Sequence, residues 1–188
     1  MQSDSGAGAC LNSYALVSYI TGPLGLYLDR IRRELVHSCI AQSHVTILPP
    51  RSLSPIEEST KIELSQVLQD YRPFRVDLQT VQVFESTSVI YLAIGEGSEE
   101  LKHLHERLNE GSLACDEAYG YHPHVTLAHQ FPPEQLNDMM ELARARWREF
   151  QNERSFEVDR LTFVQNTTTN RWLDLADFPL GDPVLSGT

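Results

Sequence analysis

The sequence predicts an α+β fold in which two similar units, each ordered strand, helix, strand, helix, strand, pack around a pseudo-two-fold axis. The tripeptide His-Val-Thr occurs at 44–46 and again at 124–126, each time in an apolar run that leads to two prolines. Strand-like and helix-like segments follow one another in the same order around both copies. Such internal repetition is the first architectural signal to look for in a chain.

The first unit covers residues 13–84. It opens with a β-branched and aromatic run at 13–20, which predicts a strand. Apolar residues then recur at helical spacing, and the run at 44–48 predicts the strand that carries the first His-Val-Thr. The apolar residues of the intervening helix are Leu24, Leu28, Ile31 and Leu35.

A second helix of this unit is expected over 54–71. Ser54 can cap it, Pro55 suits its first turn, and Glu57 completes a capping box. Its apolar stripe consists of Leu64, Val67, Leu68 and Tyr71. The alternating segment 74–84 closes the unit as a strand.

The second unit, residues 88–164, repeats the order. We expect a strand at 88–95, a helix closed by Gly111, a strand at 124–128, a second helix, and a last strand at 156–164. The apolar stripe of the first helix is Leu101, Leu104 and Leu108, and that of the second is Leu136, Met139, Met140, Ala143 and Trp147.

The double prolines at 49–50 and 132–133 are interpreted as punctuation before a helix of each unit. Segment 169–178 predicts one more strand, and the ends 1–9 and 179–188 resemble loose tails. The whole chain of 188 residues is therefore expected to form a single bilobal domain. Antiparallel-rich sheets would line a central cleft, with the helices outside.

Composition restricts the function classes. A formal net charge of -11 disfavours a long RNA or DNA partner, because the averaged surface repels a polyanion. Cys10, Cys39 and Cys115 are odd in number and form no CxxC pair, which argues against a disulfide framework or a zinc ribbon. A reducing cytoplasm fits this usage. The N-terminus shows neither a basic flank nor the ~20 apolar residues of a membrane span, so we expect a cytoplasmic protein.

The repeated tripeptide places two polar side chains on one face of each strand. Side chains alternate along a strand, so His44 and Thr46 share one face, as do His124 and Thr126. Pseudo-two-fold symmetry would bring the two histidines and two threonines together across one cleft.

This set of groups suits an in-line displacement at phosphorus. One neutral imidazole can deprotonate the attacking water, one imidazolium can protonate the departing oxygen, and hydroxyls can donate to the non-bridging oxygens. Histidine suits both roles because its usual pKa of about 6.5 lets both forms exist near neutrality. The scheme needs neither a metal nor another cofactor.

The motifs HVTI at 44–47 and HVTL at 124–127 resemble those of the two-histidine (2H) phosphoesterase superfamily, whose hallmark is two H-x-[ST]-hydrophobic motifs in two pseudo-symmetric lobes. Within it, the chain is similar to bacterial proteins named 2′-5′ RNA ligase, which hydrolyse 2′,3′-cyclic phosphates on RNA ends to 2′-phosphates. Relatives act on ADP-ribose 1″,2″-cyclic phosphate or 2′-5′ oligoadenylate.

The resemblance implies a role for each motif residue. His44 would be the proton donor, His124 the proton acceptor, and Thr46 and Thr126 the phosphate clamps. The implied partner is a small nucleotide or an RNA terminus that bears a cyclic phosphate. Spacing alone does not distinguish donor from acceptor, because the two copies are symmetric.

One position departs from the family pattern. Many bacterial members carry an arginine after the second motif, as H-x-T-L-x-R, whereas this chain has His129 there. The departure weakens the case for a polynucleotide substrate. Arg51, which follows the first motif, could supply a replacement charge for substrate binding, or could be an exposed loop arginine.

Aromatic residues near the motifs are further candidates for substrate binding. Tyr119 and Tyr121 directly precede the second motif and could stack on a base, or could simply pack in a loop. Tyr14 on the first strand and Trp172 near the end are weaker candidates for the same role.

Other polar groups have bland explanations. His122 and His124 could share a strand face and hold a metal, but no Asp or Glu lies in the same run. His103 and His105 are two apart on a helix and are expected to be solvated. The arginine runs also predict solvated helix faces rather than basic strips. They comprise Arg30, Arg32 and Arg33, and Arg144, Arg146 and Arg148.

The sequence supports three functional hypotheses. The first is a metal-independent 2H phosphodiesterase that opens 2′,3′-cyclic or related cyclic phosphates on nucleotides or RNA ends. The second is a non-catalytic nucleotide or RNA-end binding module with the same fold, and the third is a metal-dependent hydrolase built on His122 and His124. The sequence leaves the oligomeric state open, with a monomer as the default.

Overall fold

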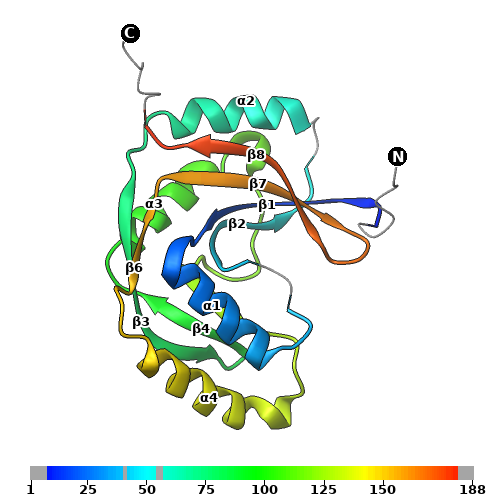
Figure 1. Cartoon of the computed structure of the whole chain (residues 1–188). Coiled ribbons are helices and arrows are strands. Elements are labelled where there is room, and N and C mark those ends of the chain that lie inside the picture. The colour runs from blue at the N-terminus through cyan, green and yellow to red at the C-terminus, as the bar shows by residue number, and fades with distance from the viewer. Residues whose placement is uncertain (1–7, 40–41, 54–56, 182–188) are drawn as a thin grey trace, which may run out of the picture.

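The computed structural model describes residues 8–39, 42–53 and 57–181, and its strands form two four-stranded antiparallel sheets. Figure 1 shows one sheet in the upper part of the molecule and the other below it. The first sheet has the order β2 (His44–Arg51), β1 (Cys10–Tyr19), β7 (Arg160–Thr167), β8 (Trp172–Pro179). The second has the order β5 (His124–Ala128), β4 (Val89–Ile94), β3 (Phe74–Phe84), β6 (Ser155–Val158).

In the described part of the chain, four helices accompany these sheets: α1 (Gly22–Leu35), α2 (Glu57–Leu68), α3 (Ser98–Leu108) and α4 (Leu136–Glu149). Short 3-10 turns, η1 (Gly111–Leu113) and η2 (Pro133–Gln135), precede β5 and α4. Helix α1 packs against β5 and α3 against β2, so each of these helices contacts the motif strand of the other unit. No helix in the described part of the chain is both long and apolar enough to cross a membrane.

The predicted α+β class and the paired strand, helix order are confirmed, but the two units exchange their last strands. β3 ends the first unit yet pairs with β4, and β7 ends the second unit yet pairs with β1. The physical reason for the first exchange is local. A four-residue turn over 85–88 joins β3 to β4, so the two strands form a hairpin.

The single strand predicted over 156–164 is wrong. The chain breaks at Asp159 into β6, which pairs with β3, and β7, which pairs with β1. The Asp159 carbonyl accepts the amide of Leu180 at 2.8 Å, a partner outside both strands. The chain therefore passes from one sheet to the other at this residue.

The double prolines differ in position between the units. β2 continues through Pro49 and Pro50 to Arg51, so the first pair does not end the strand as expected. β2 lies at an edge of its sheet, where a residue without an amide proton costs no ladder bond. β5 does end at Ala128, before the second pair at 132–133.

Both ends are more ordered than predicted where the structure describes them. Thr168 donates its amide to the Ala9 carbonyl at 2.8 Å, and the Leu180 side chain is buried. Residues 1–7 and 182–188 lie outside the described residues, as do Ser54 and Pro55 of the predicted helix cap.

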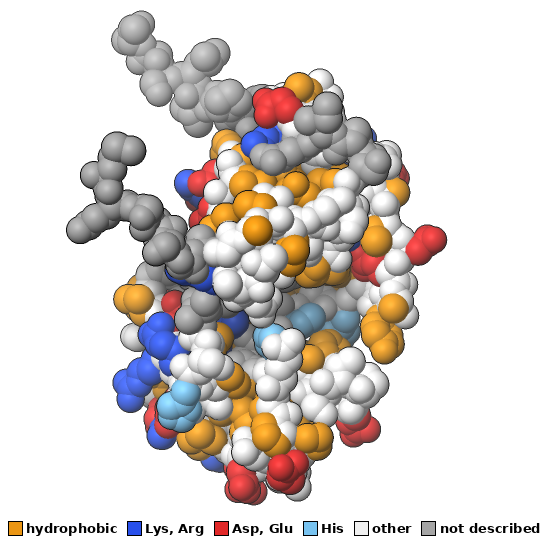
Figure 2. All heavy atoms as spheres, turned by 90° about the vertical axis from the view of Figure 1, so that its right-hand side faces the viewer, with side chains coloured by type: hydrophobic (Ala, Val, Ile, Leu, Met, Phe, Trp, Pro, Cys, Tyr) orange, Lys and Arg blue, Asp and Glu red, His pale blue; other side chains and the backbone are white. Residues whose placement is uncertain are grey.

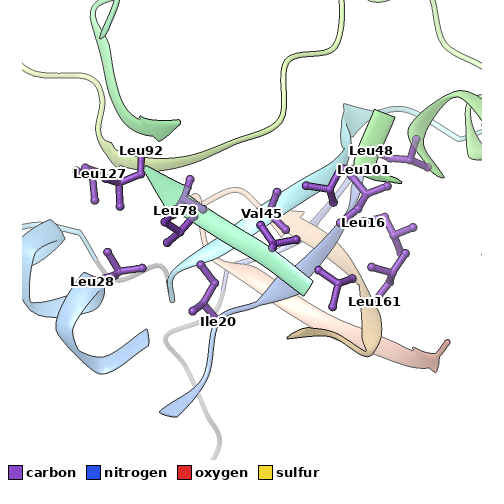
Figure 3. Close-up of a cluster of buried hydrophobic side chains, with 14 of the residues drawn as sticks. Leu16, Ile20, Leu28, Val45, Leu48, Leu78, Leu92, Leu101, Leu127 and Leu161 are labelled. Carbon is purple, nitrogen blue, oxygen red and sulfur yellow. The ribbon is translucent and has the colours of Figure 1, made fainter. Parts of the chain in front are cut away.

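One continuous apolar core joins the two sheets and the helices, and Figure 3 shows part of it. The predicted stripes contribute to it: Leu28 and Ile31 of α1 and Ala143 of α4 are at most 1% exposed. A separate small cluster of Ala15, Val17 and Val164 lies on the other face of the first sheet. That sheet thus has a core face, to which Val45 contributes, and a second face, to which His44 and Thr46 of the first motif belong.

Candidate phosphate site

The two His-Val-Thr motifs meet at the centre of the molecule. β2 and β5 are each an edge strand of their own sheet, and they contact one another. Val45 and Val125 are fully buried, whereas the histidines and threonines of both motifs are partly exposed, which confirms the predicted alternation. Figure 2 shows histidine side chains grouped in a hollow between the upper and lower parts of the molecule.

The same backbone hydrogen bond orients both histidines. Nδ1 of His44 lies 2.7 Å from the carbonyl oxygen of Gln42, and Nδ1 of His124 lies 2.7 Å from that of His122. A carbonyl accepts only, so each Nδ1 carries the proton. Nε2 of each ring is therefore the nitrogen left to exchange a proton with a ligand.

The surroundings disfavour the charged form of both rings. Burial and the Arg32 guanidinium, with a smaller contribution from His124, lower the pKa of His44 to about 4, although the Gln42 carbonyl and Asp29 act in the opposite direction. Burial is also the main cause that lowers the pKa of His124, with His122 contributing. A lowered pKa favours the neutral form of both rings at pH 7.

Aromatic rings surround His124. Phe84 and Tyr91 stack on one another with centroids 4.0 Å apart, and both meet the His124 ring edge to face at 5.0 and 5.3 Å. Tyr91 pairs with Thr126 in the β4–β5 ladder. These two residues escaped prediction because strand register, which the sequence does not reveal, brings them to the motif.

The face of the first sheet beside His44 is polar and acidic. Tyr19 is the ladder partner of His44, meets its ring edge to face at 6.2 Å, and donates its hydroxyl to Asp174 at 2.7 Å. Thr162 donates to Asp177 at 2.6 Å. A cavity of about 690 Å³ is lined by Tyr19, Asp174, Thr162 and Asp177, and also by Gln42, Glu157 and Arg160.

Arg51 does not supply a mobile positive charge. Its side chain is buried at the end of β2, so it is not an exposed loop residue either. The guanidinium donates to Glu117 at 2.6 Å and to Asn109 and the Leu113 carbonyl, both at 2.6 Å. Since Glu117 neutralises it, Arg51 braces β2 and has no free charge to offer a ligand.

The tyrosines predicted to bind substrate have different positions. Tyr121 stacks on His105 with centroids 3.9 Å apart and donates its hydroxyl to the Thr46 carbonyl at 2.8 Å, so it packs against the first motif strand. Tyr14 stacks on Phe163 at 5.3 Å. Tyr119 is 71% exposed and remains sterically accessible.

Two residues expected to be solvated are buried. His105 is 6% exposed, and its Nδ1 lies 2.7 Å from the Ile47 carbonyl because α3 packs against β2. Arg32 is 3% exposed and donates to the Thr126 carbonyl at 2.9 Å. Their predicted neighbours His103, Arg30 and Arg33 are exposed as expected.

His122 and His129 flank the second motif and are both exposed. The His122 and His124 rings lie 6.4 Å apart, and both pack edge to face on Phe84. Within residues 8–39, 42–53 and 57–181, no three His, Cys, Asp or Glu side chains group closely enough to hold a metal ion. Although the His129 residue is exposed as a whole, partial desolvation of its imidazole and the Arg32 guanidinium lower its pKa. This residue therefore differs from the arginine of the family pattern in charge as well as in shape.

Comparison with known proteins identifies the family. Residues 30–170 match the model of the 2′-5′ RNA ligase superfamily. A protein of Geobacillus thermodenitrificans named "Putative phosphoesterase" is 25% identical over 148 residues, which is 77% of this chain and 82% of the relative. A protein of the same description from Oceanobacillus iheyensis is 28% identical over 120 residues, 63% of this chain and 68% of its own length.

Solved structures share the fold. TT0787 of Thermus thermophilus superimposes with a TM-score of 0.62 at 16% identity, covering 91% of this chain and all of that chain. LigT of E. coli, complexed with NADP+, gives a TM-score of 0.60 at 16% identity over 94% of this chain and all of its own. LigT has also been solved with 3′-AMP and with phosphate.

Proposed function

Because the chain belongs to the 2′-5′ RNA ligase superfamily of two-histidine phosphoesterases, we propose that it opens cyclic phosphates on nucleotides or RNA ends without a metal ion. One observation carries the proposal. Two histidines on adjoining edge strands have the same Nδ1 bond to a carbonyl, which leaves both Nε2 atoms for proton transfer. A threonine of the same strand face accompanies each of them.

The chemistry is an in-line displacement. Nε2 of His124 accepts a proton from water as the water oxygen bonds to phosphorus, and the imidazolium of His44 gives a proton to the departing ribose oxygen as the P–O bond breaks. The Thr46 and Thr126 hydroxyls donate to the non-bridging oxygens. The product is a phosphomonoester with a free neighbouring hydroxyl, a 2′-phosphate if the chain follows the proteins that it resembles.

The donor role requires that His44 be protonated in the complex. Its pKa of about 4 keeps it neutral before substrate binds. A phosphate anion beside the ring favours the imidazolium and raises this pKa, so the proton enters with or after the ligand. Proton uptake on phosphate binding is therefore part of the proposal.

A small nucleotide is favoured over a long polymer. LigT, which has the same fold, has been solved with 3′-AMP, ATP and NADP+. The formal net charge of -11, together with Asp174 and Asp177 in the cavity beside Tyr19, opposes a polyanion at this face.

The low pKa of His44 also favours a second candidate, a non-catalytic module that binds a nucleotide phosphate in the same site. A permanently neutral His44 could still donate a hydrogen bond but could not act as a general acid. Calorimetry would support this candidate if a nucleotide 2′-phosphate bound tightly while every substrate remained intact.

The deciding assay follows hydrolysis of 2′,3′-cyclic nucleotides, cyclic-phosphate RNA ends and ADP-ribose cyclic phosphate in EDTA. We expect His44→Ala and His124→Ala each to lower turnover by roughly 10²–10⁴-fold, the usual contribution of one proton transfer. His103→Ala, at an exposed position of α3, is the matched control and keeps wild-type activity.

Two results would refute the assignment: a wild-type protein inert toward the whole panel, or alanine variants of His44 and His124 as active as wild type. Activity that chelation abolishes and a divalent metal restores would instead support the metal-dependent hydrolase.

A further inference from the structure

Arg32 belongs to helix α1, and its side chain reaches the second motif strand. Its side chain is 3% exposed, and α1 packs against β5 at this position. Nη1 donates to the carbonyl oxygen of Thr126 at 2.9 Å, and Nη2 lies 3.6 Å from Sγ of Cys39. A cation is thus fixed to the backbone of a residue whose hydroxyl belongs to the candidate phosphate site.

The charge of Arg32 has no counter-ion among the described residues. No carboxylate of the described chain lies within 4.0 Å of its guanidinium, and its Nε is buried without a hydrogen-bond partner. Asp29, one turn earlier on α1, is committed to the amide and hydroxyl of Ser43 at 2.7 and 2.6 Å. Burying an unpaired cation is costly, and an anion bound near the Arg32 guanidinium would offset this cost.

The equivalent bond in the other motif is neutral. The carbonyl of Thr46 accepts its hydrogen bond from the Tyr121 hydroxyl, whereas the carbonyl of Thr126 accepts from a guanidinium. Holding an edge strand in place therefore does not require a charge. The asymmetry indicates that the charge itself has a use on the β5 side.

We propose that Arg32 is a positioning residue of the phosphate site, which fixes Thr126 and supplies the positive potential that attracts the phosphate anion. This inference rests on the proposed function of the site. The positive charge of Arg32 acts on residues of both motif regions, since it contributes to lowering the pKa of both His44 and His129. The other groups that act on the pKa of His44 are the Gln42 carbonyl beside its ring, His124 from β5 and Asp29 from α1. Tyr19 of β1 is in ring contact with it.

The test uses inorganic phosphate as the probe, so it does not depend on turnover. Calorimetry at pH 7 and low salt gives the Kd of phosphate, and NMR titration gives the pKa of His44. We expect Arg32→Met to weaken phosphate binding about tenfold and to raise the His44 pKa toward its usual value. Arg32→Lys keeps the charge and should preserve the pKa of His44. Arg30→Met, at an exposed position of the same helix, should change neither quantity.

A folded Arg32→Met protein with wild-type phosphate affinity and an unchanged His44 pKa would overturn the inference. If Arg32→Met does not fold, the wild-type Nε–H resonance of Arg32 replaces it: a shift on adding phosphate, absent for Arg30, supports the inference, and no shift overturns it. If substitution of His44 or His124 abolishes phosphate binding while the Arg32 variants bind phosphate as tightly as wild type does, only the role of Arg32 is refuted. Wild type that binds no phosphate refutes the site itself.

Discussion

The two site histidines have the same backbone hydrogen bond but different electrostatic surroundings. The Arg32 guanidinium lowers the pKa of His44, whereas the stacked rings of Phe84 and Tyr91 pack against the His124 ring. The resemblance assigns proton donation to the ring with the stronger cationic neighbour. A bound anion would favour the protonated form of His44, because its negative charge opposes both the repulsion by Arg32 and the desolvation of the ring.

The depressed pKa of His44 predicts how stability depends on pH. The folded-state value of about 4 lies below the usual 6.5, so the unfolded chain binds more protons between these values. The free energy of unfolding should therefore fall as pH falls from 6.5 toward 4, with no contribution from His44 above pH 7. Because the ring is partly exposed, we expect His44 to lower the free energy of unfolding by about 1–3 kcal/mol over this pH range.

Urea unfolding at pH 7.5, 6 and 5 measures this effect as the difference between wild type and His44→Ala. The variant should lose less stability on acidification, and His103→Ala should follow the wild-type curve. Identical pH dependence in wild type and His44→Ala would show that the His44 ring is not desolvated in the folded state.

At the residue scale, the sequence predicts the facing of side chains along a strand but not the burial of the arginines. The shared face of His44 and Thr46 depends on a period of two, which is local. The burial of Arg51 and Arg32 depends on partners far along the chain, Glu117 and Thr126. A run of arginines looks the same whether one of its members meets solvent or a strand from the other unit.

At the scale of elements, β2 is an edge strand whose outer carbonyls are covered by side chains. The Tyr121 hydroxyl donates a hydrogen bond to the Thr46 carbonyl. The His105 ring makes a hydrogen bond with the Ile47 carbonyl, and the Arg51 guanidinium donates to the Pro49 carbonyl. Glu117 holds two of these groups, at 2.6 Å from Arg51 and 3.6 Å from Nε2 of His105. This network closes an edge that would otherwise be open to pairing with another chain.

Removing the charge of Glu117 should destabilise the fold. Glu117→Gln leaves the Arg51 guanidinium, whose side chain is 2% exposed, without a counter-ion among the residues that the structure describes. Breaking a buried pair by removing one partner costs about 3 kcal/mol, and urea unfolding at pH 7 measures it. The control is Glu110→Gln, which removes an exposed pair with Arg107 and should cost less than about 0.5 kcal/mol. Equal effects of the two substitutions would mean that the network does not support β2.

Helices were predictable at this scale because their apolar stripes are local, as Leu28 and Ala143 illustrate. The break at Asp159 was not, because Phe156 to Val164 alternates well enough for one strand. Only the competing partners, β3 for β6 and β1 for β7, separate the two segments.

At the scale of the whole molecule, the exchange of β3 and β7 ties the two sheets into one unit. Each sheet contains strands from both halves of the chain, and a single core contacts both. If one sheet unfolds, strands from both halves of the chain lose their partners, so the other sheet is disturbed as well. The candidate phosphate site, which lies where β2 meets β5, should therefore stay assembled until the whole protein unfolds.

The chain contains two tryptophans, and they report on different sheets. Trp147 is 3% exposed on α4, which packs against β3, whereas Trp172 opens β8 and packs beside Ala15 and Val17. In Trp147→Phe the remaining fluorescence follows the first sheet, and in Trp172→Phe it follows the second. Within each variant, we expect the urea midpoint from fluorescence to equal that from far-ultraviolet circular dichroism, because the exchanged strands make unfolding a single transition. A fluorescence midpoint displaced from the dichroism midpoint in either variant would mean that one sheet melts alone, and that the exchanged strands do not couple the two halves of the site.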